Sequence, residues 1–191
     1  TAGDGGGTGR DGGGTAGDGG GTELDFRPFV DSTLYPVARI GDIAEATGVL
    51  RYTLGFLVAQ GPSDCTPSWG GYHGLEAGPD SWGESGQYFL YDEIDRVRAA
   101  GGDAVVSLGG ASCTPLAAAC DSADELVDQL RAIVDRLELA AIDFDIEGAW
   151  LAHDESVTRR NAAIAALQGE LAARPRWSDG RVRDRSRHQP A

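Results

Sequence analysis

Short apolar runs alternate with amphipathic segments from Phe26 onward, and this alternation limits the possible folds more than any other feature. The apolar runs predict strands at residues 28–31, 52–59, 104–108 and 141–147, and the amphipathic segments predict helices at residues 37–47, 90–100, 122–137 and 157–173. Ser122 and Glu125 have the spacing of a capping box at the start of the third helix. Four strand–helix units in succession predict an α/β fold, with a parallel sheet and helices outside it.

The stretch from Asp143 to Gly148 places three acids at alternate positions. Successive side chains of a strand point to opposite faces, so Asp143, Asp145 and Glu147 are expected on one face. The apolar run that precedes them indicates a buried strand rather than a solvated one. Acids this close repel, so sharing a proton raises the pKa of at least one of them. This pattern favours acid–base chemistry.

Other polar or glycine positions also lie where predicted strands end. Asp31 ends the first strand, and Ser107, Gly109 and Gly110 end the third. The carboxyl ends of parallel strands meet at one edge of the sheet, where catalytic residues of such folds are found. Residues 60–86, rich in Gly, Pro, Ser and Trp, are expected to form a long loop over the same edge.

Composition restricts the partners of the chain. The net charge is −14, with 30 acidic and 16 basic residues, and all the basic ones are arginine. Such a chain is not expected to bind nucleic acid through general electrostatics. No apolar run approaches the roughly 20 residues of a membrane span, so no membrane insertion is expected.

The two ends of the chain differ from the middle. Residues 1–22 repeat in sevens and carry almost no apolar side chains, which predicts a disordered Gly-rich linker to a module upstream. Residues 174–191 carry six arginines without hydrophobic periodicity and are expected to be a disordered tail. The folded domain is therefore placed at residues 23–173.

Two motifs together resemble family 18 of the glycoside hydrolases, the chitinases. They are Ser107-x-Gly109-Gly110 on the third strand and Asp143-x-Asp145-x-Glu147 on the fourth. Segments 29–31, 65–71 and 142–148 are most similar to secreted actinobacterial members. The resemblance implies a (β/α)8 barrel of which this chain supplies about the first four units, an extracellular location, and an upstream carbohydrate-binding module.

The resemblance also implies roles. Glu147 would protonate the glycosidic oxygen, and Asp145 would hold the N-acetyl group of the substrate, whose carbonyl oxygen attacks the anomeric carbon. Asp143 would share a proton and accept a hydrogen bond from Ser107. Gly109 and Gly110 would allow close backbone approach. The remaining expected substrate contacts are Asp31, Trp69 and Trp150, the two tryptophans as sugar-stacking surfaces. No cofactor or metal is implied.

The three cysteines allow one disulfide and one free thiol. Cys65 and Cys120 lie on the loops after the second and third strands, which are neighbours at the predicted rim. That pair is preferred for the disulfide, and Cys113 with Cys120 is the alternative. Neither spacing matches a zinc site.

The chain departs from the family pattern in two ways. Ala140 stands where the family motif usually begins with Asp. Four strand–helix units are also half of the eight in a complete barrel, so the first and fourth strands are expected to be open edges. The chain alone is expected to be a truncated barrel without activity.

The sequence therefore predicts a hydrolase of chitin or chito-oligosaccharides, with β-1,4-linked N-acetylglucosamine units as substrate. Two alternatives stay open: a chitin-binding relative without catalysis, and an endo-β-N-acetylglucosaminidase that shares the motif. A metal-dependent enzyme is the weakest hypothesis, because three acids on one strand lack a His or further oxygen ligands nearby.

Overall fold

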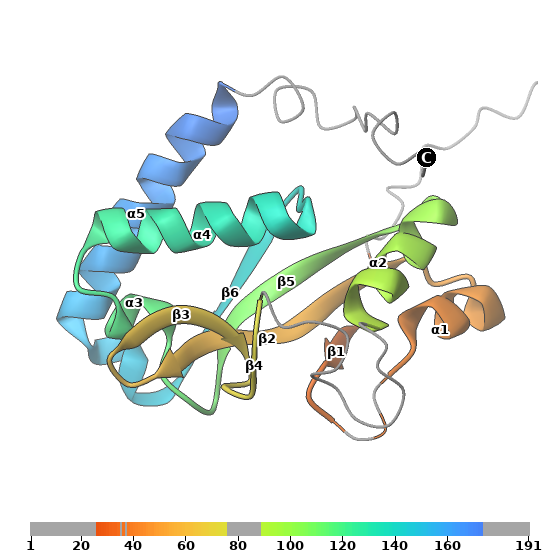
Figure 1. The fold of residues 1–191 in the computed structure, drawn as a ribbon, viewed down its shortest axis with the longest axis horizontal. Coiled ribbons are helices and arrows are strands. Elements are labelled where there is room, and N and C mark those ends of the chain that lie inside the picture. The colour runs from red at the N-terminus through yellow and green to blue at the C-terminus, as the bar shows by residue number, and fades with distance from the viewer. Residues whose placement is uncertain (1–25, 35, 37, 76–88, 174–191) are drawn as a thin grey trace, which may run out of the picture.

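The computed structural model describes residues 26–34, 36, 38–75 and 89–173 (Figure 1). The predictions made for residues 1–22 and 174–191, and for most of the second half of the 60–86 loop, lie outside these residues. Within the described part, no helix is long and apolar enough to cross a membrane.

Four parallel strands form the centre of the described part, as predicted. They are β1 (Phe29–Asp31), β2 (Arg51–Gly61), β5 (Asp103–Gly110) and β6 (Ile142–Ile146). β1 pairs with β2, β2 with β5, and β5 with β6. The register between β2 and β5 shifts between Leu54 and Leu57, where the Gly55–Phe56 peptide bond is cis.

A β-hairpin occupies the first part of the segment that was predicted to be a loop. β2 continues to Gly61, and β3 (Asp64–Trp69) runs back antiparallel to it before β4 (His73–Gly74) pairs with β3. The loop prediction was wrong for these residues. Gly, Pro and Ser are poor strand formers, and here the pairing with the end of β2 overrides their local preference.

Helices follow the parallel strands and lie on one side of the sheet (Figure 1). They are α1 (Ile40–Thr47), α2 (Phe89–Ala99), α4 (Ala123–Leu137) and α5 (Asp154–Ala172), with the single turn α3 (Leu116–Ala119) before α4. All four predicted helices are present. The third was predicted one residue early, the first and fourth about three residues from their true starts, and α3 was not predicted.

Helix ends explain most of these differences. Ser122 accepts a hydrogen bond from the Glu125 amide, as the capping box requires, but the Glu125 carboxylate accepts from the Asp121 amide instead of that of Ser122. α5 begins early because Nδ1 of His153 accepts a hydrogen bond from the Ser156 amide. Histidine is an uncommon cap, so the sequence carried little signal for it.

Helices cover one face of the sheet, and no described helix packs on the other, here called the open face, although Thr53, Val105 and Ser107 on it are buried. Leu54, Val106 and Leu108 point toward the helices and belong to the main core. Thr53, Val105 and Ser107 alternate with them and therefore point to the other face. No described helix packs on that second face, which is the face that would line the interior of a closed barrel.

A buried carboxylate joins α1 to α2. Glu93 is 1% exposed, accepts a hydrogen bond from the Gly41 amide at 2.6 Å, and pairs with Arg96 at 2.9 Å and Arg39 at 3.2 Å. It thus satisfies an amide of the first turn of α1, where an anion is also favoured by the helix dipole. Arg96 in addition pairs with Glu45, whose side chain is 71% exposed.

A single arginine ties together three elements at the opposite end of the sheet from the acids. Arg98 donates to Asp103 at the start of β5 and to the carbonyl oxygens of Leu137 and Glu138 at the end of α4. Glu138 has a φ of 51°, and Arg98 therefore satisfies carbonyls that the helix end leaves free.

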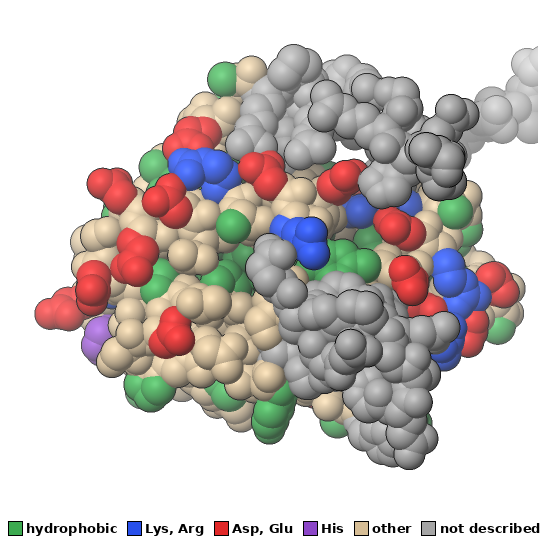
Figure 2. All heavy atoms as spheres, viewed as in Figure 1, with side chains coloured by type: hydrophobic (Ala, Val, Ile, Leu, Met, Phe, Trp, Pro, Cys, Tyr) green, Lys and Arg blue, Asp and Glu red, His purple; other side chains and the backbone are tan. Residues whose placement is uncertain are grey.

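Ion pairs also cross the outer surface. Arg131 of α4 donates to both carboxylate oxygens of Glu170 on α5, at 2.9 and 2.8 Å. Figure 2 shows acidic side chains spread over this face with arginines among them. Exposed pairs of this kind contribute little stability, about 0 to 1 kcal/mol each.

Two of the three carboxylates that pair with Arg96, Glu93 and Glu45, allow a matched comparison. We expect Glu93→Ala to lower the free energy of unfolding by about 2 to 3 kcal/mol, because it leaves the buried Gly41 amide without an acceptor and removes one partner of Arg96 and of Arg39. We expect Glu45→Ala to cost less than about 1 kcal/mol, because that pair is exposed. Urea unfolding of both variants measures the difference. Equal effects would contradict the role assigned to Glu93.

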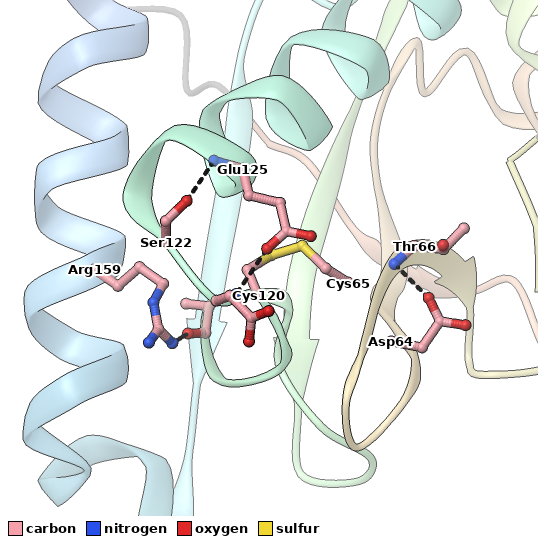
Figure 3. Close-up of a disulfide and its surroundings, with 9 residues drawn as sticks. Asp64, Cys65, Thr66, Cys120, Ser122, Glu125 and Arg159 are labelled. Carbon is pink, nitrogen blue, oxygen red and sulfur yellow. Dashed lines mark hydrogen bonds between the residues drawn. A yellow bond between two sulfur atoms is a disulfide. The ribbon is translucent and has the colours of Figure 1, made fainter.

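The disulfide joins Cys65 on β3 to Cys120 in the loop between α3 and α4, with Cα atoms 4.6 Å apart (Figure 3). This is the preferred pair, and Cys113 is a free, exposed thiol. The bond lies beside the Ser122–Glu125 cap of α4, while Arg159 of α5 donates to the Ala117 carbonyl of α3. The hairpin is therefore tethered to the layer formed by α3, α4 and α5.

Removal of this tether has a calculable effect. The cysteines are 55 residues apart, and a loop of that length corresponds to about 4 kcal/mol in the chain-entropy description. We expect Cys65→Ser with Cys120→Ser to destabilise the fold by up to about that amount in urea unfolding. Cys113→Ser is the control, with an expected change below about 0.5 kcal/mol. A Cys113 effect as large as that of the double variant would refute the assignment.

Candidate active site

The acids of β6 lie opposite the two small-residue positions of β5. Ser107 is paired with Asp143, and Gly109 with Asp145. In-register neighbours in a parallel sheet point to the same side, so Ser107, Asp143 and Asp145 share the open face. Phe144, between the acids, packs against the core on the helix side. The predicted one-sided arrangement of the two aspartates is what the structure has.

Asp143 is held by a short hydrogen bond. The Ser107 hydroxyl, which is fully buried, donates to Oδ2 of Asp143 at 2.6 Å. The bond fixes the orientation of the carboxyl group and leaves its second oxygen for a neighbour.

The glycines of β5 are required by the backbone of β6 and by Phe56. Gly109 has a φ of 117°, and a Cβ atom there would collide with the Asp145 carbonyl oxygen. Gly110 has a φ of 89°, and a Cβ atom there would lie 3.1 Å from the Phe56 ring. Larger residues would therefore push β6 or Phe56 away. Close approach, predicted for both glycines, is present.

Glu147 follows β6 immediately and precedes the short helix η3 (Gly148–Ala152). Its side chain is exposed at the carboxyl end of the strand. The negative charge of Asp145 raises the pKa of Glu147 above its ordinary value, and partial desolvation and a hydrogen bond with Asp145 act in the same direction. The carboxyl group of Glu147 therefore keeps its proton to higher pH than an isolated glutamate.

Two further predicted site residues, Asp31 and Trp150, are half-buried. Asp31 is half-buried and turned back on its own loop, because its Oδ1 accepts from the amide and the hydroxyl of Thr33 at 2.8 and 2.6 Å. Trp150 is half-buried, with its ring edge-on to His153 and the centroids 5.5 Å apart. Both lie at or beyond the carboxyl ends of their strands.

Trp69 is buried rather than displayed. Its side chain is 1% exposed and belongs to the main core, and its Nε1 has no hydrogen-bond partner among the described residues. The ring therefore offers no face on which a sugar could stack in this structure. The physical reason is the hairpin, which places Trp69 opposite Leu57 at the end of β3.

Phe56 is the residue near the site that sequence reasoning missed. Its ring contacts Gly110 and lies 6.2 Å from the Phe29 ring, at 31° between the planes. Both rings lie on the side of the sheet that carries the acids. Strict alternation along residues 52–59 would have placed the Phe56 ring on the helix side of the sheet. The register shift at Gly55 and Phe56 turns the ring to the opposite side.

Among the residues that the structure describes, one group has metal-ligand spacing: Cys65, Cys120 and Glu125. The two sulfurs are joined in the disulfide, so they offer no thiolates to a metal. The group carries no metal proposal.

The electrostatics at the end of β6 predict a change in titration. We expect Asp145→Asn to lower the pKa of Glu147 toward that of an ordinary glutamate, because the variant removes the negative charge that raises it most. Titration of the Glu147 carboxyl carbon by NMR measures the shift. Asp154→Asn, which removes an exposed acid at the start of α5, is the control and should leave this pKa in place. An unchanged pKa in the Asp145 variant would contradict the coupling.

Comparisons with known proteins agree with this geometry. The chain is 38% identical over 143 residues to an Escherichia coli (strain K12) protein described as "Probable bifunctional chitinase/lysozyme", and 36% identical over 143 residues to Endochitinase 11 of Metarhizium anisopliae. Each match covers 75% of this chain, but only 15% and 25% of the respective relatives. No family model matches the chain.

Solved structures show the same fold. The catalytic domain of a hyperthermophilic chitinase from Pyrococcus furiosus superposes with a TM-score of 0.62 at 23% identity, over 76% of this chain and 42% of that one. A family GH18 chitinase from Chromobacterium violaceum gives 0.52 at 17% identity, over 76% and 37%. The α/β fold is therefore that of part of a chitinase catalytic domain, as predicted, and the chain is chitinase-like in sequence.

Proposed function

We propose that this chitinase-like chain carries the acid–base centre of a glycoside hydrolase that cleaves β-1,4-linked N-acetylglucosamine polymers. The observation that carries the proposal is Glu147, an exposed acid at the end of β6 whose pKa is raised by Asp145. A general acid has to be protonated near its working pH and within reach of the bond it cleaves. The charge of Asp145 shifts the pKa of Glu147 in the direction that the first requirement needs, and the exposure of Glu147 leaves it accessible to a substrate.

In the proposed reaction the proton moves from Glu147 to the glycosidic oxygen as the bond to the anomeric carbon breaks. The acetamido carbonyl oxygen of the same sugar forms the new bond to that carbon, while the Asp145 carboxylate holds the acetamido N–H. Water then forms a bond to the anomeric carbon from the face left by the departing sugar and gives a proton to Glu147, while the bond between that carbon and the acetamido oxygen breaks and the acetamido group is restored. The configuration is retained, and no covalent bond to the protein forms.

Asp143 has a supporting part in this proposal. The Ser107 hydroxyl holds its carboxyl group in one orientation, on the same face as Asp145. A carboxyl fixed at that position can take a proton as Asp145 turns toward the substrate. The Ala140 position, where the family motif usually has Asp, is exposed here, so the relay would end at Asp143 and Ser107.

The chain spans 15% to 25% of the length of the curated relatives, and 42% of the Pyrococcus furiosus domain. We therefore propose that the centre works within a complete barrel and that the 191 residues alone turn over substrate poorly or not at all. The disulfide supports an extracellular location, since such bonds persist in oxidising compartments. The Gly-rich composition of residues 1–22 is that of a flexible linker, which supports a carbohydrate-binding module upstream.

A chimaera tests the proposed function. Residues 26–173 of this chain would replace the matched 143 residues of the Escherichia coli relative, so that the rest of that protein completes the site. We expect hydrolysis of a fluorogenic chitobioside, and a loss of about 10²- to 10⁴-fold with Glu147→Gln, because the amide cannot donate the proton. Glu155→Gln, which alters an exposed acid of α5, should keep the rate of the unchanged chimaera.

The alternatives give different results in the same assay. A folded chimaera that binds chitin without hydrolysing it would indicate a binding protein. Release of intact glycans from glycoproteins, with no action on the chitobioside, would indicate an endo-β-N-acetylglucosaminidase. Equal rates for Glu147→Gln and Glu155→Gln would exclude Glu147 as the acid.

A further inference from the structure

The short helix η3 directly follows Glu147, and none of its residues is buried. β6 ends at Ile146, whose pairing with Gly110 is the last of the β5–β6 ladder. The sheet therefore holds the backbone of Glu147 from one side only. On the other side, the Glu147 carbonyl oxygen accepts a hydrogen bond from the Trp150 amide at 3.2 Å. The position of Glu147 thus depends on the contacts that hold η3, because burial in the core does not hold it.

His153 connects η3 to α5. Its ring lies 5.5 Å from the Trp150 ring between centroids, with the two planes at 71°, an arrangement in which aromatic rings attract each other. Nδ1 of His153 accepts a hydrogen bond from the Ser156 amide at 3.3 Å. The His153 carbonyl oxygen accepts from the Ser156 hydroxyl and from the Val157 amide, both at 3.0 Å. One residue therefore contacts η3 with its ring and the first turn of α5 with its ring nitrogen and its backbone.

The helix α5 gives this connection a fixed support. Ser156, in its first turn, is 1% exposed, and Arg159 donates a hydrogen bond to the Ala117 carbonyl oxygen of α3 at 2.6 Å. Three further residues of α5 belong to the main core: Ala163, Leu167 and Leu171. Close-packed interiors allow little displacement of the elements that form them. A side chain attached to the start of α5 is therefore held in place relative to the sheet.

We propose that His153 and Trp150 are positioning residues for Glu147, because they hold η3 against α5 and so keep the Glu147 carboxyl group beside Asp145. Neither side chain touches the reacting atoms in this role. The importance of the role for hydrolysis rests on the proposed function, whereas the placement of Glu147 beside Asp145 exists without a substrate. A displacement of about 1 Å at a reacting group can cost about 100-fold in rate, so contacts of this kind decide whether an acid is effective.

This role differs from the sugar-stacking role that the sequence suggested for Trp150, and kinetics distinguish the two. A ring that binds a sugar in the ground state contributes to KM, whereas a residue that places the acid contributes to kcat. The variants of His153 add a second distinction. Asparagine keeps a side-chain cap for α5 but has no aromatic ring, and phenylalanine keeps a ring but has no acceptor for the Ser156 amide.

The first test measures the pKa of Glu147 by NMR in the complete 191-residue chain, without a substrate. We expect Trp150→Ala and His153→Asn to lower this pKa toward that of an ordinary glutamate. Both variants release η3, and the carboxyl group then lies less often beside Asp145, whose charge raises the pKa most. His153→Phe should keep the raised pKa, because it restores a ring beside Trp150. Ser122→Ala removes the cap of α4 instead and should leave the pKa of Glu147 unchanged.

The second test uses the chimaera with the Escherichia coli relative. We expect His153→Asn to lower kcat for the fluorogenic chitobioside by about 10- to 100-fold and to leave KM within about twofold. His153→Phe should recover most of this loss, and Ser122→Ala should keep the rate of the unchanged chimaera. A chimaera without any hydrolysis would count against the proposed function alone, because the pKa of Glu147 in the 191-residue chain decides the positioning.

Three results would overturn the proposal. The first is an unchanged pKa of Glu147 in both Trp150→Ala and His153→Asn, in chains whose circular dichroism is that of the unchanged protein. The second is an equal fall of the pKa in Ser122→Ala, which would indicate general loosening of the fold. The third is a higher KM at unchanged kcat in Trp150→Ala, which would assign the ring to sugar binding.

Discussion

The parallel pairing of β5 with β6 is the contact on which the candidate site depends. It brings Ser107 opposite Asp143 and Gly109 opposite Asp145, so that one hydrogen-bond ladder decides which groups meet the acids. A slip of one residue would turn Phe144 to the open face and both aspartates into the helix-covered core. The cost of burying two carboxylates without partners excludes that register. The apolar and acidic residues of β6 therefore specify the same pairing from opposite faces.

The pairing of β5 with β6 also depends on the glycines of β5, because they leave room for the β6 backbone and for the Phe56 ring. At Gly109 the β6 backbone approaches so closely that a Cβ atom has no room, and at Gly110 the Phe56 ring takes the space. The acids, the serine and the aromatic ring thus reach their positions because β5 lacks side chains at two consecutive residues. Phe56 in turn reaches the open face only through the bulge in β2. The candidate site therefore depends on two irregular features of the sheet, the glycines of β5 and the bulge in β2.

Periodicity was sufficient to predict the four parallel strands, their helices and the shared face of Asp143 and Asp145, because apolar spacing reports which side of an element is buried. It was insufficient for the β3 hairpin, whose residues have low strand propensity and are ordered by pairing with β2. Trp69 shows the same limit. A tryptophan in a Gly- and Ser-rich segment suggests an exposed ring, and the antiparallel turn buries it instead. The position of Phe56 depends on a bulge, for which a single sequence contains no periodic signal.

Arg98 connects three elements at the end of the sheet where the parallel strands begin. With one side chain it joins the end of α2, the start of β5 and the end of α4, at the opposite end of the sheet from Glu147. Arg98 thus stabilises the end of the sheet away from the acids, while the Cys65–Cys120 disulfide holds the loops after the strands. Substitutions in those loops can alter which sugars are accepted while the contacts of Arg98 stay in place. Relatives that share these contacts can therefore differ in substrate specificity and keep the same fold.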